Sequence, residues 1–273
     1  MQWDKVKNTL LVILLAVNLF LLSSLGVKLW QSRQRDEQLE DSLRTLTAAH
    51  GLTLDEAFSL PRDRLLPQLM LDRSRAEEEA VSLSMLGEDA VRTELEDGAV
   101  RFESEKGALV WGTDGTVQGE CRTETETPAD AREMEQTAQR LLSAWGLLEE
   151  NSVLTAETAS AVLTGTVAGM PVHNRQLTLE LEEERAVLSG VWSFGTPYTT
   201  AQESGTVCAA ADALLAFAEQ TEEPARVLSM TAGYRLTVDS SRRLRLMPTW
   251  KITTDLGEYL VDCAKKTTVE PEK

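Results

Sequence analysis

An uncharged apolar run near the N-terminus constrains this chain more than any other feature of its sequence. Leu10 to Val27 contains no charged residue over 18 positions, a length of about 27 Å as an α-helix. A buried helix of that length would normally carry a polar face, and this run has none. Trp3 and Trp30 flank it about 40 Å apart along a helix, the spacing of aromatic anchors at two bilayer surfaces. We therefore predict a transmembrane helix over residues 10–30, after a cytoplasmic N-terminus of residues 1–9.

The alternative to a retained anchor is a cleaved signal peptide, whose best small-residue site is Ser24-x-Gly26. A short N-terminus before a long C-terminal region is the usual form of a signal anchor. We therefore expect a single-pass protein of the cell membrane with its C-terminal region outside the cytoplasm. Asn18 lies in the middle of the run, where its amide either hydrogen-bonds a neighbouring helix or is a tolerated single polar residue.

The charge of the chain excludes nucleic acid as an expected partner. The sequence has 27 Lys and Arg against 44 Asp and Glu, a net charge of −17. Residues 1–35 hold five of the bases and one of the acids, so the remainder carries a net charge of −21. Such a surface repels nucleic acid and anionic lipid headgroups. The three cysteines, Cys121, Cys208 and Cys263, allow at most one disulfide, and we expect them to be buried as small apolar residues.

Hydrophobic periodicity beyond the membrane run predicts an α+β protein built from helix-plus-antiparallel-sheet modules. A stalk helix and linker over residues 31–60 precede three modules, at residues 61–125, 126–200 and 201–273. Each module begins with an amphipathic helix and continues with strands. The helices are predicted over Ser74–Leu86, from a cap at Thr127 to Gly146, and from a cap at Thr206 to about Gln220.

The sequence lacks the short motifs that carry common enzyme chemistry. It has no Gly-x4-Gly-Lys-Ser/Thr loop, no Gly-x-Gly-x-x-Gly, no Gly-x-Ser-x-Gly and no Cys-x-x-Cys. The histidines, His50 and His173, have no partner at metal-ligand spacing. Carboxylates are plentiful, but no pair stands out. We therefore predict no enzyme activity, catalytic residue, metal, cofactor or small-molecule ligand.

The C-terminal stretch carries a resemblance to a known family. Gly233-Tyr234 begins a strand, and the chain then reads Pro248-Thr-Trp250-Lys-Ile and Gly257-Glu-Tyr259-Leu-Val-Asp262-Cys-Ala264. This string resembles the Pro-x-Trp-(Arg/Lys)-(Ile/Val) and Gly-x-Tyr-x-(Val/Ile)-(Asp/Asn)-x-Ala hairpin that ends PepSY-like and YycH/YycI-type extracytoplasmic domains. The usual tail Ala-x-x-Gly-Glu is replaced here by Ala264-Lys-Lys-Thr-Thr-Val-Glu270.

The N-terminus is also similar to the start of the YycI family. Met1-Gln-Trp-Asp-Lys-Val-Lys-Asn-Thr9 is followed at once by an apolar run containing Asn18-Leu-Phe20. The resemblance implies an accessory regulator of a sensor histidine kinase in a cell-wall two-component system of Gram-positive bacteria. Its implied partners are that kinase and a YycH-type sister protein. The alternatives are a PepSY-like envelope protein that inhibits or escorts a secreted protease, and a wall-associated protein of another role.

Overall fold

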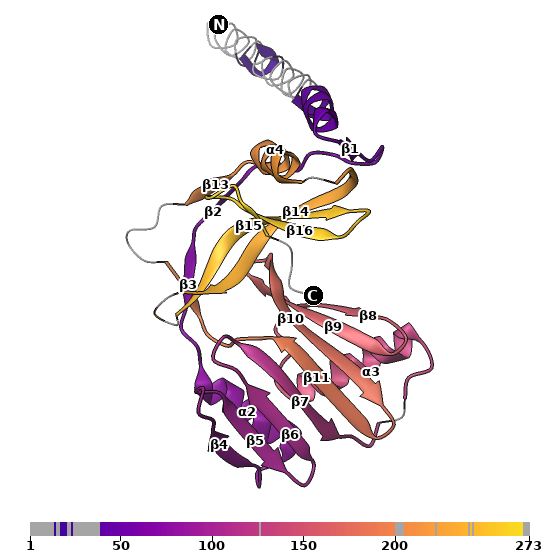
Figure 1. The fold of residues 1–273 in the computed structure, drawn as a ribbon, viewed down its shortest axis with the longest axis vertical. Helices are drawn as coiled ribbons and strands as arrows, with labels where there is room; N and C mark the ends of the chain where they lie inside the picture. The colour runs from indigo at the N-terminus through magenta and orange to yellow at the C-terminus, as the bar shows by residue number, and fades with distance from the viewer. Residues whose placement is uncertain are drawn as a thin grey trace, which may run out of the picture.

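The computed structural model describes residues 14, 17–20, 23, 39–125, 127–199, 205–221, 223–239, 241 and 243–269. Residues 39–49 form a helix that leads into the globular part (Figure 1). The other helices are α2 (Arg75–Leu86), α3 (Ala131–Ala144) and α4 (Ala210–Gln220). The strands are β1 (Leu52–Leu54), β2 (Arg64–Leu66), β3 (Leu69–Leu71), β4 (Val91–Glu94), β5 (Val100–Ser104), β6 (Gly107–Trp111), β7 (Thr116–Arg122), β8 (Val153–Ala156), β9 (Ser160–Val167), β10 (Met170–Glu182), β11 (Arg185–Val191), β12 (Pro197–Tyr198), β13 (Thr206–Cys208), β14 (Ala225–Val238), β15 (Leu244–Thr254), β16 (Glu258–Asp262) and β17 (Thr268–Val269).

Fifteen of these strands form one sheet, with the path β12-β3-β15-β14-β10-β11-β7-β6-β5-β4. Strands β1, β8, β9, β16 and β17 branch from this path, and β2 pairs with β13 in a separate ribbon. The neighbours are antiparallel except that β14 pairs in parallel with β1 and with β10. The predicted α+β class with antiparallel pairing is therefore confirmed, and the strands of the predicted modules join one continuous sheet.

Two buried cores divide the globular part. Residues 75–194, here the inserted half, form a core in which α2 packs on β5 and β6 and α3 packs on β8 and β9. Residues 52–71 join residues 197–269, here the composite half, around α4, β14, β15 and β16. The sequence of the inserted half is thus placed between two segments of the composite half (Figure 1). Residues of the predicted modules 61–125 and 126–200 share one core, whereas residues 66–71 pack with the third module.

Local sequence signals located the start of α2 correctly and the start of α3 incorrectly. Ser74 caps α2 as predicted, because its hydroxyl accepts a hydrogen bond from the backbone N–H of Glu77. The predicted cap at Thr127 is wrong: α3 begins at Ala131, and its cap is Asp130, whose Oδ1 accepts from the N–H of Glu133 at 2.8 Å. An acidic side chain three positions before an N–H that it can reach is a stronger cap than the threonine upstream.

The third helix corrects the sequence prediction in a different way. Thr206 does not cap a helix, because Thr206–Cys208 is strand β13 and pairs with β2. Helix α4 begins only at Ala210, and no local side chain caps it. Asp63 supplies the acceptor instead, taking the N–H of Ala210 on its Oδ1 at 2.9 Å. Long-range pairing therefore overrode a plausible local cap.

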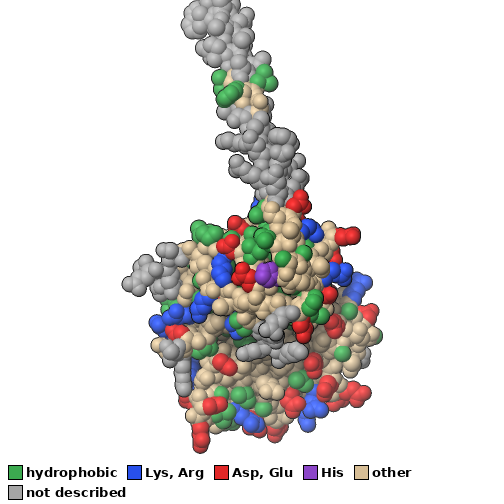
Figure 2. Space-filling view, turned by 45° about the horizontal axis from the view of Figure 1, so that its top comes forward, with side chains coloured by type: hydrophobic (Ala, Val, Ile, Leu, Met, Phe, Trp, Pro, Cys, Tyr) green, Lys and Arg blue, Asp and Glu red, His purple; other side chains and the backbone are tan. Residues whose placement is uncertain are grey.

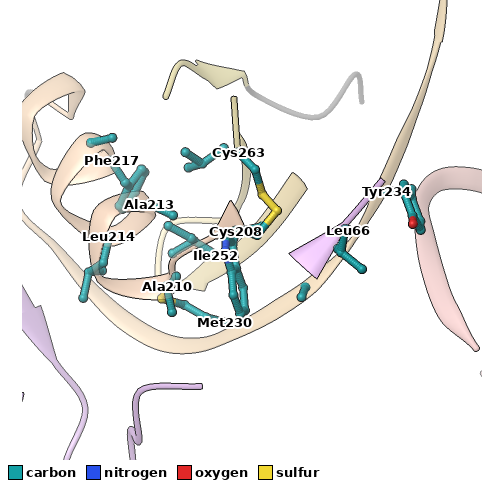
Figure 3. Close-up of a cluster of buried hydrophobic side chains, with 14 of the residues drawn as sticks. Leu66, Cys208, Ala210, Ala213, Leu214, Phe217, Met230, Tyr234, Ile252 and Cys263 are labelled. Carbon is teal, nitrogen blue, oxygen red and sulfur yellow. A yellow bond between two sulfur atoms is a disulfide. The ribbon is translucent and has the colours of Figure 1, made fainter. Parts of the chain in front are cut away.

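A disulfide joins two of the three cysteines (Figure 3). Cys208 is the last residue of β13 and Cys263 directly follows β16, so the bond links two segments of the composite core that are 55 residues apart in sequence. Cys121 is buried and free in the inserted half. The expectation of buried cysteines holds for all three, but the expectation that they are simply small apolar residues is corrected for the bonded pair.

The predicted membrane segment falls mostly outside the described residues. Trp3, Leu10, Val27 and Trp30 lie there, whereas Asn18 belongs to the helical residues 17–20 and is exposed. The described part of this segment also exposes the hydrophobic side chains Leu14, Val17, Leu19 and Phe20 (Figure 2). A search of the described part of the chain yields no helix with the length and apolar character needed to cross a bilayer.

Candidate functional site

Four of the eight family-like hairpin residues form the scaffold of the composite half. Tyr234 and Pro248 face each other across β14 and β15, and Trp250 lies opposite Ala232. Tyr234 and Trp250 are almost fully buried, and burial raises the pKa of the Tyr234 phenol. Tyr259 stacks on Phe217 of α4 with ring centroids 5.0 Å apart. These side chains hold α4 on the sheet and are not available to a partner.

The other hairpin residues shape turns. Gly257 closes the β15–β16 turn, where its carbonyl accepts from Thr254 N–H at 2.8 Å. The carboxylate of Asp262 accepts from the backbone N–H groups of Ala264 and Lys265, both at 2.8 Å. Ala264 is exposed within this turn. The residues that carry the resemblance therefore serve the fold of the hairpin.

Gly233 marks the junction between the two halves. Val172 of β10 pairs with Tyr234, which is the register contact that joins the sheet of the inserted half to that of the composite half. The Asn174 side chain extends this junction, because its Nδ2 donates to Leu236 O at 2.9 Å and its Oδ1 accepts from Leu236 N–H at 2.7 Å. A Cβ on Gly233 would collide with the carbonyl of Pro171. Only glycine permits this close approach.

His173 lies in the junction against the face of the sheet that is turned away from α4. Its Nε2 would be 2.6 Å from a Cβ at Gly233, and no hydrogen-bond partner for it exists among the described residues. Burial lowers the pKa of His173 to about 4, and the nearby charge of Lys251 acts in the same direction. Glu258 opposes that effect but is itself paired with Lys251, with Nζ and Oε1 2.9 Å apart. His173 is therefore a neutral, buried side chain at neutral pH.

Arg175 forms a second polar cluster beside the junction. Its Nη1 donates to Glu149 Oε2 at 2.8 Å, its Nη2 also contacts Glu149, and Nη2 donates to Ser193 O at 2.8 Å. The guanidinium lies 4.0 Å from the ring centroid of Trp192. A cavity of about 240 Å³ adjoins this cluster and reaches Leu246 of the composite half. Glu149 neutralises the buried cation, so the cluster stabilises the inserted half where it contacts the composite half.

A groove of about 470 Å³ lies on the opposite face of the composite sheet from α4, and we call it the open-face groove. Side chains of a strand alternate between faces. Because Tyr234 and Leu236 join the core beneath α4, Arg235 and Thr237 point to the other side. The groove is lined by Gln68, Arg235, Thr237, Val238, Asp239, Arg245, Met247, Thr249, Leu260, Asp262, Lys265, Thr267 and Val269.

The sequence prediction singled out none of the cations in this groove. Arg235 and Arg245 are ordinary strand residues in the sequence, and their shared face follows only once β14 and β15 are aligned. The available signal was the alternation of polar and apolar residues in β15, which places Arg245, Met247 and Thr249 on one face. Recognising a groove needed the positions of β16 and β17 as well.

The described residues contain no group of three or more His, Cys, Asp or Glu side chains that could hold a metal ion. A cavity of about 1110 Å³ lies at the far end of the inserted half beside Met85 and the β10–β11 turn. Its lining mixes Lys106 and Arg122 with Glu124, Glu183 and Glu184. This mixture is typical of charged turns facing solvent.

Comparisons with known proteins give a shared fold. No protein-family model matches the sequence, and no curated protein matches it. Among solved structures, an uncharacterized protein from Eubacterium rectale ATCC 33656 is similar, with a TM-score of 0.51 and 11% identity over 81% of this chain and 91% of that one. The Bacillus megaterium YpeB C-terminal domain gives a TM-score of 0.35 and 6% identity over 75% of this chain and 100% of that domain. The first likeness is one of fold alone, and the second supports no conclusion.

Proposed function

We propose that this chain is a YycI-type accessory regulator of a sensor histidine kinase, anchored in the membrane by residues 10–30. Its N-terminus lies in the cytoplasm and its α+β region, with a PepSY-like C-terminal hairpin, lies outside. It acts by protein–protein contacts with the kinase and with a YycH-type sister protein. The proposal assigns it no chemistry of its own.

The observation that carries this proposal is a set of exposed side chains on the N-terminal helical residues. Asn18 is exposed, and so are Leu39 and Leu46 on the helix of residues 39–49. Leu39 and Leu46 are seven residues apart, so they lie on one side of that helix. An exposed amide and two exposed leucines on helical residues are suited to contact with a helix of another protein.

The disulfide supports the proposed location of the α+β region. Disulfides form and persist in oxidising environments, including the exterior of bacterial cells, and are rare in the reducing cytoplasm. The Cys208–Cys263 bond is therefore typical of a region that folds outside the membrane.

Co-purification tests the proposal directly. The full-length protein is isolated from membranes of its own host in mild detergent, and the kinase and sister protein are expected with it. Asn18→Leu is expected to weaken their recovery while leaving membrane insertion intact, because an amide that bonds a neighbouring helix is lost. Ser23→Leu is the matched control, since Ser23 is also an exposed polar residue of this segment and lies on another side of the helix.

Recovery of neither partner, with an unchanged kinase regulon on deletion, would refute the regulator function. A secreted protease recovered in their place would favour the PepSY-like inhibitor or escort. If the kinase still associates after residues 10–30 are exchanged for an unrelated membrane helix, that segment is only a tether.

A further inference from the structure

The open-face groove concentrates positive charge on a strongly acidic protein. The chain carries a net charge of −17, yet the groove lining holds three cations, Arg235, Arg245 and Lys265. Its two acids are already engaged within the chain. Asp239 binds Arg245, with Oδ2 and Nη2 3.1 Å apart, and the Oδ1 of Asp262 accepts the backbone N–H groups of its own turn.

Arg235 is the cation best placed to meet a ligand. It is partly buried in β14, and no hydrogen bond or ion pair involves its guanidinium anywhere in the described residues. The ammonium of Lys265 likewise has no partner in that part of the chain. A partly buried guanidinium without a partner forfeits the two parallel hydrogen bonds that it would make with a carboxylate.

An apolar strip lies beside these cations. Met247, Leu260 and Val269 line the groove, and none of them belongs to either buried core. Leu260 is 3% exposed, so it forms the floor, while Met247 and Val269 are partly exposed. A small ion would use the cations but not this strip. A ligand that uses both needs an anionic group and an apolar group joined by a short backbone.

The edge of the sheet favours an extended ligand. Strand β17 runs along the groove, and β16 is its single partner among the described strands. The backbone N–H of Thr268 on this short strand already donates to Oε1 of Gln220 at 2.8 Å. An extended peptide would therefore lie along this edge mainly through side chains that reach the neighbouring pockets. The groove volume of about 470 Å³ is also within the range that accommodates a ligand much larger than one carboxylate.

We infer that the open-face groove binds an acidic, extended peptide segment of a protein partner. A carboxylate of the segment pairs with Arg235, and an apolar side chain rests on Met247, Leu260 and Val269. This inference rests on the proposed function in one respect, since it takes the occupant to be another protein. It identifies the contact surface and the chemistry of the partner's segment.

The test is fluorescence anisotropy of labelled hexapeptides with the full-length protein in detergent micelles. The probe alternates leucine and glutamate. One comparison peptide alternates leucine and lysine, and the other alternates serine and glutamate. The leucine–glutamate peptide is expected to bind saturably, and each comparison peptide about tenfold or more weakly. Equal binding of all three peptides, or no binding of the first, would overturn the inference.

Three variants locate the binding. Arg235→Glu is expected to lower the affinity for the leucine–glutamate peptide by about tenfold or more. Arg235→Gln is expected to lower it by a smaller factor, because only the glutamate adds repulsion. Arg140→Glu is the matched control: it makes the same change of charge at an exposed position on α3, and unchanged affinity is expected. Loss of affinity in all three, or in none, would overturn the site. If inorganic phosphate displaces the leucine–glutamate peptide, and the serine–glutamate peptide binds equally well, the groove is a simple anion site and the peptide site is refuted.

The kinase co-purification separates this inference from the proposed function. Recovery of the kinase with native protein but undiminished recovery with Arg235→Glu would overturn the groove as the partner's contact surface and leave the regulator function standing. Selective peptide binding without any kinase recovered would refute the regulator function and leave the groove as a peptide site.

Discussion

Lowering the pH from 7.5 to 5.5 is expected to destabilise this protein through His173. The folded state holds the pKa of this imidazole near 4 because it is buried, whereas an unfolded chain restores about 6.5. Between these two values the unfolded state binds the extra proton. The neutral His173 imidazole therefore costs the folded state nothing above about pH 6.5, and the protein loses unfolding free energy as the pH falls from there toward 4. The two pKa values give a loss of about 1.4 kcal/mol at pH 5.5 from this group alone.

The surroundings of His173 explain why the folded state resists the proton. Nε2 has no acceptor within the described residues, and Lys251 contributes a like charge. Glu258 would favour the charged form, but its carboxylate is shared with Lys251. Backbone groups of Thr231 and Thr249 also favour the charged form, but the burial of the imidazole at the junction between the two halves outweighs them.

Urea denaturation followed by tryptophan fluorescence measures this effect. Native protein, His173→Gln and His50→Gln are compared at pH 7.5 and 5.5, above the isoelectric point near 4.6. The fall in unfolding free energy between the two pH values is expected to be about 1.4 kcal/mol smaller in His173→Gln than in native protein. His50 is exposed, so His50→Gln is expected to match native protein. An equal fall in native protein and His173→Gln would refute the reasoning, whatever the stability of the variant at pH 7.5.

Three further changes test the packing of the halves, each by urea denaturation at pH 7.5. Gly233→Ala should lower the free energy of unfolding by roughly 1–3 kcal/mol, because the new Cβ would press on the Pro171 carbonyl and the His173 ring of β10. An unchanged urea midpoint would mean that the junction adjusts to the Cβ without cost. Cys263→Ser should cost about 4 kcal/mol from the entropy of a loop of 55 residues, and a reductant should then have no further effect. Glu149→Gln should cost about 2 kcal/mol by leaving the Arg175 cation buried with weaker partners, and restored stability in a double variant with Arg175→Met would confirm that cause.

Strand and turn patterns were read well wherever the pattern was local. The helix predicted over Ser74–Leu86 with Ser74 as its cap is α2, Arg75–Leu86, and strands follow it as predicted. Alternation of apolar and polar residues depends on one strand and its two faces, and a cap depends on four neighbouring residues. Such signals need no knowledge of distant parts of the chain.

The candidate site was less accessible from the sequence. Four of the eight hairpin residues that carry the family resemblance are buried, and among them Tyr234 and Trp250 hold the sheet together. The groove depends instead on Arg235 and Met247, which no motif distinguishes. Their neighbourhood is set by strand register, which decides which side chains of adjacent strands stand side by side.

The sequence by itself determined the α+β class, the succession of helices and strands, and the cap of α2, because each rests on short-range periodicity; the membrane anchor stays a prediction. The tertiary structure decided that residues 52–71 join the C-terminal half, that Asp63 caps α4, and that Cys208 bonds Cys263. It also decided which face of β14 carries Arg235, whose guanidinium has no partner in the described part of the chain. These features bring together residues that are far apart in the chain, and contacts of that kind are selected by the burial of a whole core rather than by the propensity of any segment.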